Sequence, residues 1–229
     1  MIVLNIIMDN MRIESDHSKT RSNRQPREAR EQQLIEAAIH CISVLGMRDT
    51  TVPDVAARAH MAVGSISQYF ESKELLFTAA LRALSGQFEA AWRKALETAG
   101  PDPAMRLRRF VECYFQPGIC QRKKIAVWFA FWGEAKARPH YRDVCAAYDR
   151  RHDEMLESLC RALILDGGYA FEPSSAAKIV ASLCHGLWLE LLTGTDGLDR
   201  NDLAELARTS LATLFPRHAL ALSGTTPVT

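Results

Sequence analysis

From Pro26 onward, apolar residues recur at helical spacing along nearly the whole chain. The first stripe, formed by Leu34, Ala38, Cys41 and Leu45, ends at Gly46. Segments rich in Gly, Pro and Asp separate the later stripes, and no stretch of sequence shows the sustained alternation of a strand. The pattern predicts an all-α protein, with further helices near residues 52–59, 63–70, 73–99, 104–116, 121–137, 140–165, 174–193 and 201–214.

The lengths of these helices divide the chain into a small head and a larger body. We predict a flexible N-terminal arm over residues 1–26, a three-helix head over 27–72, a helical body over 73–216 and a flexible tail over 217–229. Ser72 is a favourable N-cap for the long helix that follows it. That helix is expected to lead from the head into the body.

The charge of the chain is nearly balanced, with a net charge of +1 over 229 residues, so any basic contact surface must be local. Residues 12–30 carry six Lys or Arg against three Asp or Glu, and two interpretations stay open. They form either a plain disordered tail or an arm that touches DNA phosphates or the minor groove. The apolar run at the start of the chain is too short to span a bilayer, so we expect a cytoplasmic protein with no membrane partner, whose translation starts at Met1, Met8 or Met11.

The cysteines and histidines show no metal-binding or catalytic pattern. None of the six cysteines forms a C-x-x-C pair, so we interpret them as small buried hydrophobes in a reducing compartment and expect no metal or cofactor. The sequence lacks the motifs of phosphate loops, zinc proteases and Ser-His-Asp hydrolases. Cys184 and His185 are adjacent, so their side chains diverge by about 100° on a helix and cannot act together. An enzyme is therefore not expected.

Two short helices near residues 52–59 and 63–70 have the pattern of a DNA-binding helix-turn-helix. Thr51 and Asp54 can cap the first of them reciprocally. In the second helix, Ile66 and Phe70 would face the core, whereas the residues between and before them are small or polar. Glutamine can contact adenine, and serine or tyrosine can reach phosphates or base edges. The alternatives are a structural helical hairpin and a helical adaptor that binds no DNA. The exposed polar face argues against the adaptor.

The stretch TTVPDVAARAHMAVGSISQYFESKELLFTAAL resembles the DNA-binding head of the TetR family of bacterial repressors. The usual positions of that pattern are occupied by Thr51, Ala56, Ala59, Gly64, Tyr69, Phe70, Lys73 and Leu75. The resemblance implies that Tyr69 and Lys73 hold the DNA backbone. Together the two arguments predict a DNA-facing set of Thr51, Ser65, Ser67, Gln68, Tyr69 and Lys73.

Three residues depart from the family pattern. His60 replaces the usual turn glycine and requires a strained or different turn. Ala62 replaces the usual Ser or Thr cap, which weakens that cap by about 1 kcal/mol. Ser67 replaces a common Tyr, and this ending resembles the BetI-like subgroup of repressors of choline-to-betaine genes. The stretches VWFAFWGEA and HGLWLELLTG also resemble that subgroup.

Within the body, WFAFW places four aromatic rings at residues 128–132, and these rings point in several directions from a helix. The resemblance implies a small-molecule cavity between body helices, and Trp rings beside a carboxylate can hold an alkylammonium. We therefore predict cavity walls at Trp128, Phe131, Trp132 and Trp188, with counter-charges at Glu134, Asp149 and Glu190. The alternative is that these rings are plain core. We interpret His152 and His185 as core or surface histidines.

The helices near 174–193 and 201–214 carry apolar faces that a TetR-like body uses to form a four-helix dimer interface. The residues predicted to lie there are Leu183, Leu187, Leu191 and Leu211, and Gly186 would allow helices to approach closely. The alternative, packing within one chain, is compatible with a dimer.

These observations predict an all-α protein with an N-terminal helix-turn-helix DNA-binding domain and a larger C-terminal helical domain for ligand binding and dimerisation. We expect a homodimeric repressor that binds a near-palindromic double-stranded DNA operator and is released by a small-molecule effector. A quaternary or alkylated amine, such as choline or betaine aldehyde, is the expected effector. The alternative is a sensor of neutral apolar compounds or xenobiotics that controls efflux or catabolic genes.

Overall fold

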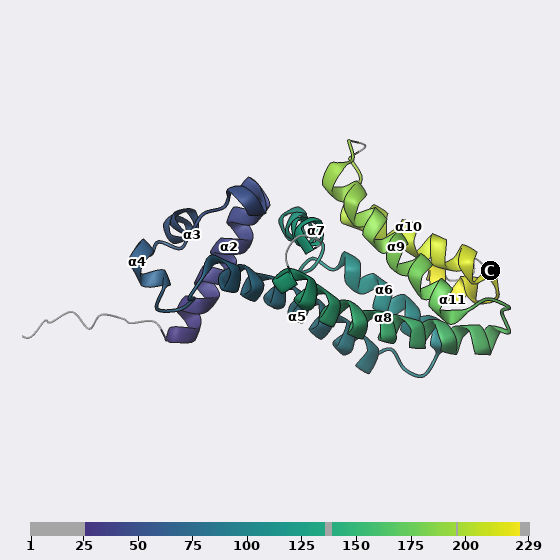
Figure 1. Ribbon diagram of the computed structural model, residues 1–229. Coiled ribbons are helices and arrows are strands. Elements are labelled where there is room, and N and C mark those ends of the chain that lie inside the picture. The colour runs from purple at the N-terminus through teal and green to yellow at the C-terminus, as the bar shows by residue number, and fades with distance from the viewer. Residues whose placement is uncertain (1–25, 136–138, 196, 225–229) are drawn as a thin grey trace, which may run out of the picture.

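The computed structural model describes residues 26–135, 139–195 and 197–224, and all regular secondary structure in these ranges is helical. The head comprises α2 (Arg27–Asp49), α3 (Val52–Arg58) and α4 (Val63–Ile66), which lie together at one end of the molecule (Figure 1). Leu34, Val55 and Ile66 are buried where the three helices meet. The all-α prediction is confirmed. The arm predicted over residues 1–26 lies, apart from Pro26, outside the described residues.

A long helix, α5 (Lys73–Glu97), connects the head to the body (Figure 1). The Ser72 hydroxyl accepts a hydrogen bond from the Leu75 amide at 3.1 Å, as expected for its N-cap. Leu76 and Phe77 are buried near the head, whereas Phe88 and Trp92 are buried in the body. The predicted boundary at residue 73 therefore marks the start of a helix that both parts share.

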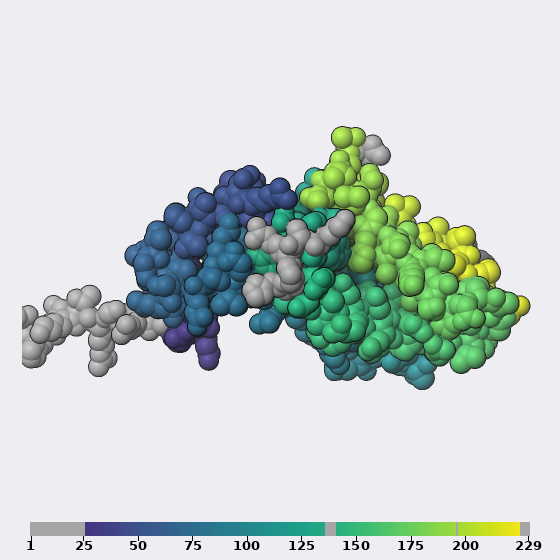
Figure 2. All heavy atoms as spheres, viewed as in Figure 1, coloured from purple at the N-terminus to yellow at the C-terminus, as the bar shows by residue number. Residues whose placement is uncertain are grey.

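The remaining helices form the body, which is the larger lobe in the space-filling view (Figure 2). Within it, α7 packs against α2 of the head as well as against α8 and α9. This packing makes α7 a second connection between head and body. The elements are α6 (Pro103–Glu112), the 3-10 helix η1 (Cys113–Phe115), α7 (Arg122–Ala135), α8 (Pro139–Gly167), α9 (Pro173–Thr193) and α10 (Arg200–Leu214).

Three local features differ from the sequence prediction. The α2 segment continues to Asp49 with a kink at Gly46, whose φ of 81° is one that glycine adopts without a steric penalty. The recognition helix is shorter than expected because α4 ends at Ile66. The expected flexible tail is not seen for residues 217–224, where η2 (Pro216–His218) and α11 (Ala219–Ser223) bury Leu222. Residues 225–229 lie outside the described part of the chain.

The core is continuous from head to body, and all six cysteines are buried and free, as predicted. Among the described helices, α9 is the one long and apolar enough to cross a membrane. It packs instead between α7, α8 and α10, and a third of its most apolar stretch is buried. Ile179 and Leu189 remain exposed on this helix, which makes it a candidate for contact with another chain.

Candidate DNA-binding and effector sites

A reciprocal cap fixes the start of the helix-turn-helix. The Asp54 amide donates to Thr51 Oγ1 at 3.3 Å, and Asp54 Oδ2 accepts from the Thr51 amide at 2.8 Å and from its hydroxyl at 2.6 Å. The hydrogen bonds from Thr51 lower the pKa of the Asp54 carboxyl. This confirms the capping box predicted for α3.

The turn between α3 and α4 is held in an unusual conformation. His60 has a φ of 53°, in the left-handed region that favours glycine, so its predicted strain is present. Gln33 Nε2 on α2 donates to the Ala59 carbonyl at 2.6 Å and ties this turn to the neighbouring helix. Ala62 provides no side-chain cap, as its sequence implied. The turn is therefore positioned by α2 and not by a cap on α4.

On α4, the outward face follows the predicted arrangement. Ile66 is buried, and Ser67 and Gln68 are exposed. The hydroxyls of Ser65 and Ser67 donate to the carbonyls of Ala62 and Gly64 at 2.7 and 3.1 Å, respectively. Their oxygen atoms keep free acceptor positions.

Cationic groups lie beside this face. The Arg27 guanidinium lies 5.7 Å from the centre of the Tyr69 ring. Lys73 Nζ lies 3.5 Å from the Arg48 carbonyl and 5.2 Å from the centre of the Phe77 ring. Tyr69 and Lys73 both follow α4 in the chain, and both lie near cationic or polar groups of the head that a DNA backbone could meet.

A cavity of about 410 Å³ lies in the body between α7, α8 and α9. Its wall combines aromatic rings with acidic groups, and α8 contributes carboxylates at successive helical turns. Among the described residues that line the cavity, Lys178 is the one cation. The lining residues are Trp132, Tyr148, Asp149, His152, Asp153, Glu157, Ser174, Ala177, Lys178, Ala181, Ser182 and His185.

Burial shifts the pKa of several groups in this wall, among them Asp149 and His185. It raises the pKa of the Asp149 carboxyl to about 6, and the negative charge of Asp153 adds to the effect. It lowers the pKa of the His185 imidazole to about 4, with a further contribution from His152. At neutral pH, Asp149 is therefore anionic but poorly solvated, and His185 is neutral.

Aromatic rings close the inner side of the cavity. The Trp132 ring lies 4.9 Å from His185 and 5.7 Å from Trp128, measured between ring centroids. Trp128 in turn lies 5.2 Å from Tyr148. A cation placed over the face of the Trp132 ring would be attracted by the ring quadrupole, and the neighbouring rings would limit its contact with water.

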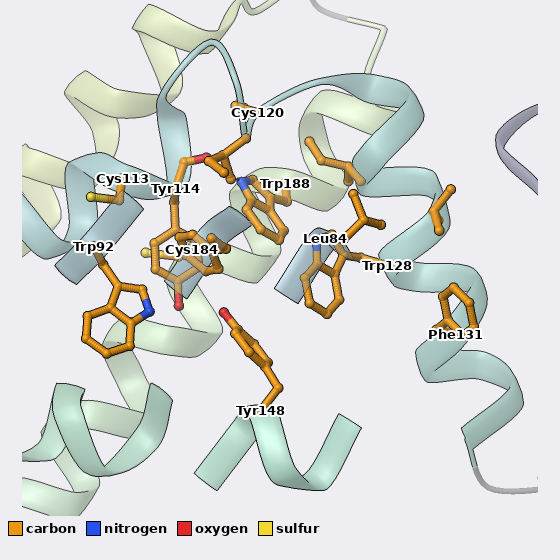
Figure 3. Close-up of a cluster of buried hydrophobic side chains, with 14 of the residues drawn as sticks. Leu84, Trp92, Cys113, Tyr114, Cys120, Trp128, Phe131, Tyr148, Cys184 and Trp188 are labelled. Carbon is orange, nitrogen blue, oxygen red and sulfur yellow. Dashed lines mark hydrogen bonds between the residues drawn. The ribbon is translucent and has the colours of Figure 1, made fainter. Parts of the chain in front are cut away.

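Tyr114 and Tyr148 differ in the hydrogen bonding of their hydroxyl groups. Tyr114 Oη shares a short hydrogen bond with His152 Nε2, and His152 Nδ1 lies 3.2 Å from Asp153 Oδ1. Tyr148 Oη is buried without a hydrogen-bond partner. Figure 3 shows both tyrosine hydroxyls turned toward the interior of the aromatic cluster. An unpaired buried hydroxyl is costly, so Tyr148 is ready to accept a partner.

Comparisons with known proteins match both parts of the chain. Residues 34–80 match the bacterial regulatory proteins of the tetR family, and residues 103–216 match the BetI-type transcriptional repressor C-terminal domain. The chain is 30% identical over 182 residues to the HTH-type transcriptional regulator BetI of Burkholderia cenocepacia, covering 79% of this chain and 91% of that protein. It is 32% identical over 166 residues to BetI of Proteus mirabilis, covering 70% and 78%.

The chain belongs to the TetR family. Its body is of the BetI type, so it is a transcriptional regulator and not an enzyme. Solved structures share the fold: a transcriptional regulator from Pseudomonas aeruginosa superposes with a TM-score of 0.75 at 25% identity, covering 89% of this chain and 98% of that one. A regulator from Saccharomonospora viridis, solved in complex with choline, has a TM-score of 0.72 at 24% identity and covers 82% and 97%.

Of the seven residues predicted to bind the ligand, two line the cavity in this TetR-family body and five do not. Trp132 and Asp149 line the cavity. The others do not, because four of them make contacts elsewhere in the fold and Glu190 points to solvent. Phe131 is fully buried against Tyr141, Trp128 stands behind the wall, Trp188 Nε1 donates to the Tyr114 carbonyl at 2.9 Å, Glu134 pairs with Arg48 at 2.7 Å, and Glu190 is exposed near the end of α9.

Several cavity residues were missed by sequence reasoning. Tyr148, His152, Asp153 and Glu157 line the cavity from α8, and His185 does so from α9. The signal was present in the helical spacing, since Asp149, Asp153 and Glu157 recur every four residues and share one face. The interpretation of His152 and His185 as core or surface histidines is thus incomplete, because both also form the cavity wall.

The predicted dimer residues also need correction. Leu211 is 1% exposed and Leu191 is 8% exposed within a single chain, so neither side chain has much surface left for a partner. Leu183 and Leu187 are half-buried. The exposed apolar side chains on these helices are instead Ile179, Leu189 and Leu206, and a Cβ atom at Gly186 would meet open space.

Proposed function

We propose that this TetR-family protein is a homodimeric, cytoplasmic repressor that is released from its DNA operator by a small alkylated ammonium compound. The observation that carries the choice of effector is the cavity between α7, α8 and α9. It places Trp132 and Tyr148 beside the carboxylates of Asp149, Asp153 and Glu157. Aromatic faces and carboxylates both attract cations, and burial has partly desolvated the carboxylate of Asp149, so an alkylammonium would meet both kinds of group.

A neutral apolar effector is the second candidate, and the charge of the cavity argues against it. A neutral compound would further desolvate Asp149 without compensating its charge. The choline in the Saccharomonospora viridis regulator supports a cationic effector here, because that protein has the same fold. Choline and betaine aldehyde are therefore the first compounds to test.

The effector signal can travel through α7. This helix presents Trp132 to the cavity, and two residues later Glu134 forms its ion pair with Arg48 on α2 of the head. A ligand that moves Trp132 would move both groups, because they lie on one rigid helical turn. The expected result is a reorientation of the heads away from the half-site spacing of the operator.

DNA binding by this protein is proposed to use α4 in the major groove of each half-site. Gln68 is the candidate for hydrogen bonding to a base, and Tyr69 and Lys73 are the candidates for phosphate contact. Thr51, Ser65 and Ser67 remain predicted to face the DNA with their hydroxyl oxygens. The dimer interface is proposed to be the exposed face of α9 and α10 around Ile179, Gly186 and Leu206.

A band-shift titration on the DNA upstream of the protein's own gene tests this proposal. The protein should shift this DNA, and choline or betaine aldehyde should release it. Lys73→Ala should weaken specific and unrelated DNA about equally, with a salt slope lowered by about one unit. Release by neutral apolar compounds but by no cationic amine would contradict the effector class, and failure to bind any DNA would contradict the proposed function.

A further inference from the structure

An exposed valine stands on the DNA-facing helix. Val63 is 50% exposed at the start of α4. Among the residues of α4, only Ile66 is buried. Single exposed apolar side chains are common on protein surfaces, but this one lies on the face proposed to meet DNA, where it would gain by contacting an apolar group.

Gly64, the next residue, is also not explained by packing within the described part of the chain. Gly64 lies within α4, where glycine costs helix stability, and a Cβ atom built on it would meet nothing within 4 Å. No described residue of the chain therefore requires a glycine here. Close approach of another molecule to the backbone of α4 does require one.

The nearby hydroxyl groups already donate hydrogen bonds within the chain. Ser65 and Ser67 donate to carbonyls of their own turn, and the Thr51 hydroxyl donates to Asp54. The helix therefore offers base edges few side-chain donors besides Gln68. The thymine 5-methyl group is the apolar feature of the major groove, and apolar side chains recognise it.

We propose that Val63 reads the 5-methyl group of a thymine in each operator half-site, at a place where Gly64 lets α4 approach the DNA closely. This inference rests on the proposed binding of DNA by the head. It adds a specificity determinant that makes no hydrogen bond. It also gives the operator a stated requirement, a thymine in each half-site that uracil cannot replace without loss.

The test begins by selecting a binding site from randomised duplex DNA with the full chain. Each thymine of the selected site is then replaced by uracil in both half-sites, which removes one methyl group and leaves base pairing unchanged. One thymine position should weaken binding about fourfold per half-site, the value expected for one buried methyl group. Val63→Ala should bind the thymine and uracil forms of that site equally.

Matched variants separate this role from general damage. Val44→Ala changes a valine that is 66% exposed on α2 and should keep the full uracil penalty. Gly64→Ala should leave thermal stability equal or higher, because alanine favours helix, while weakening the operator complex at least tenfold. A uracil penalty that is the same in wild type and Val63→Ala, or no penalty at any position, overturns the role of Val63.

Unchanged operator affinity in Gly64→Ala overturns the close approach. If no sequence is enriched from the randomised pool, the proposed function and this inference fall together. An enriched sequence that tolerates uracil everywhere overturns the inference alone, so the two failures are distinguishable.

Discussion

The polar groups of the head and those of the body cavity differ in their hydrogen bonding and in their solvation. On the head, Thr51, Ser65 and Ser67 have partners within their own turn, and the site meets solvent. In the cavity wall, Asp149 is partly desolvated and Tyr148 Oη has no partner. The polar groups of the head are thus already held in place, as expected for a surface that binds a charged polymer through complementary contacts. The cavity holds a partly desolvated carboxylate, and a ligand that compensates its charge can shift a conformational equilibrium.

The largest expected effect distinguishes a core ring from a cavity ring on the same helix. Phe131 is fully buried against Tyr141, so Phe131→Ala should lower the free energy of unfolding by about 3–5 kcal/mol. Trp132→Ala should cost less stability but weaken effector binding, because its ring lines the cavity. Urea denaturation and effector titration of both variants measure this. A stable Phe131→Ala protein that no longer responds to effector would reverse the assignment.

The next effect concerns the exposed face of α9. Ile179 is 54% exposed in one chain and is proposed to be covered in the dimer, so Ile179→Glu should cost several kcal/mol of association free energy. Leu165→Glu is the matched control, because Leu165 is 76% exposed on α8, outside this face. Sedimentation equilibrium gives the association constants. A dimer unaffected by Ile179→Glu would place the interface elsewhere.

A smaller effect on effector binding is expected for the partly buried carboxylate of Asp149. Asp149→Asn should weaken binding of a cationic effector about 10- to 100-fold, the range for a lost charge-assisted contact, while operator affinity without effector stays unchanged. Glu154→Gln is the control, since Glu154 is exposed on the same helix and does not line the cavity. Equal effector affinity in wild type and Asp149→Asn would remove Asp149 from the site.

The sequence predicted the head more completely than it predicted the cavity. Thr51, Asp54 and Ser72 act on amides within three residues, so caps, helix order and the helix-turn-helix could all be read from local spacing. The cavity depends on how α7, α8 and α9 turn relative to one another. Trp132 and Asp149 were identified by residue chemistry, whereas Phe131 and Glu134 have equally suitable chemistry and face other neighbours.

The smallest effect is a pH dependence with a defined sign. The pKa of Asp149 is raised to about 6, and a bound cation favours its ionised form. Effector affinity should therefore be nearly constant above pH 7 and fall by about tenfold between pH 7 and pH 5, as Asp149 becomes protonated. Asp149→Asn should lose this dependence. Effector affinity that rises on acidification would contradict the role assigned to the carboxylate.

The most direct test compares choline with 3,3-dimethylbutan-1-ol, a neutral compound of nearly the same shape in which carbon replaces the quaternary nitrogen. Tryptophan fluorescence gives the affinity of each compound, and anisotropy of a labelled operator gives its release. Choline should bind at least tenfold more tightly than its neutral analogue and release the operator at correspondingly lower concentration, and Asp149→Asn should reduce that difference. Equal binding and equal release by the two compounds would show that the cavity recognises shape alone, which would contradict a sensor of cationic amines.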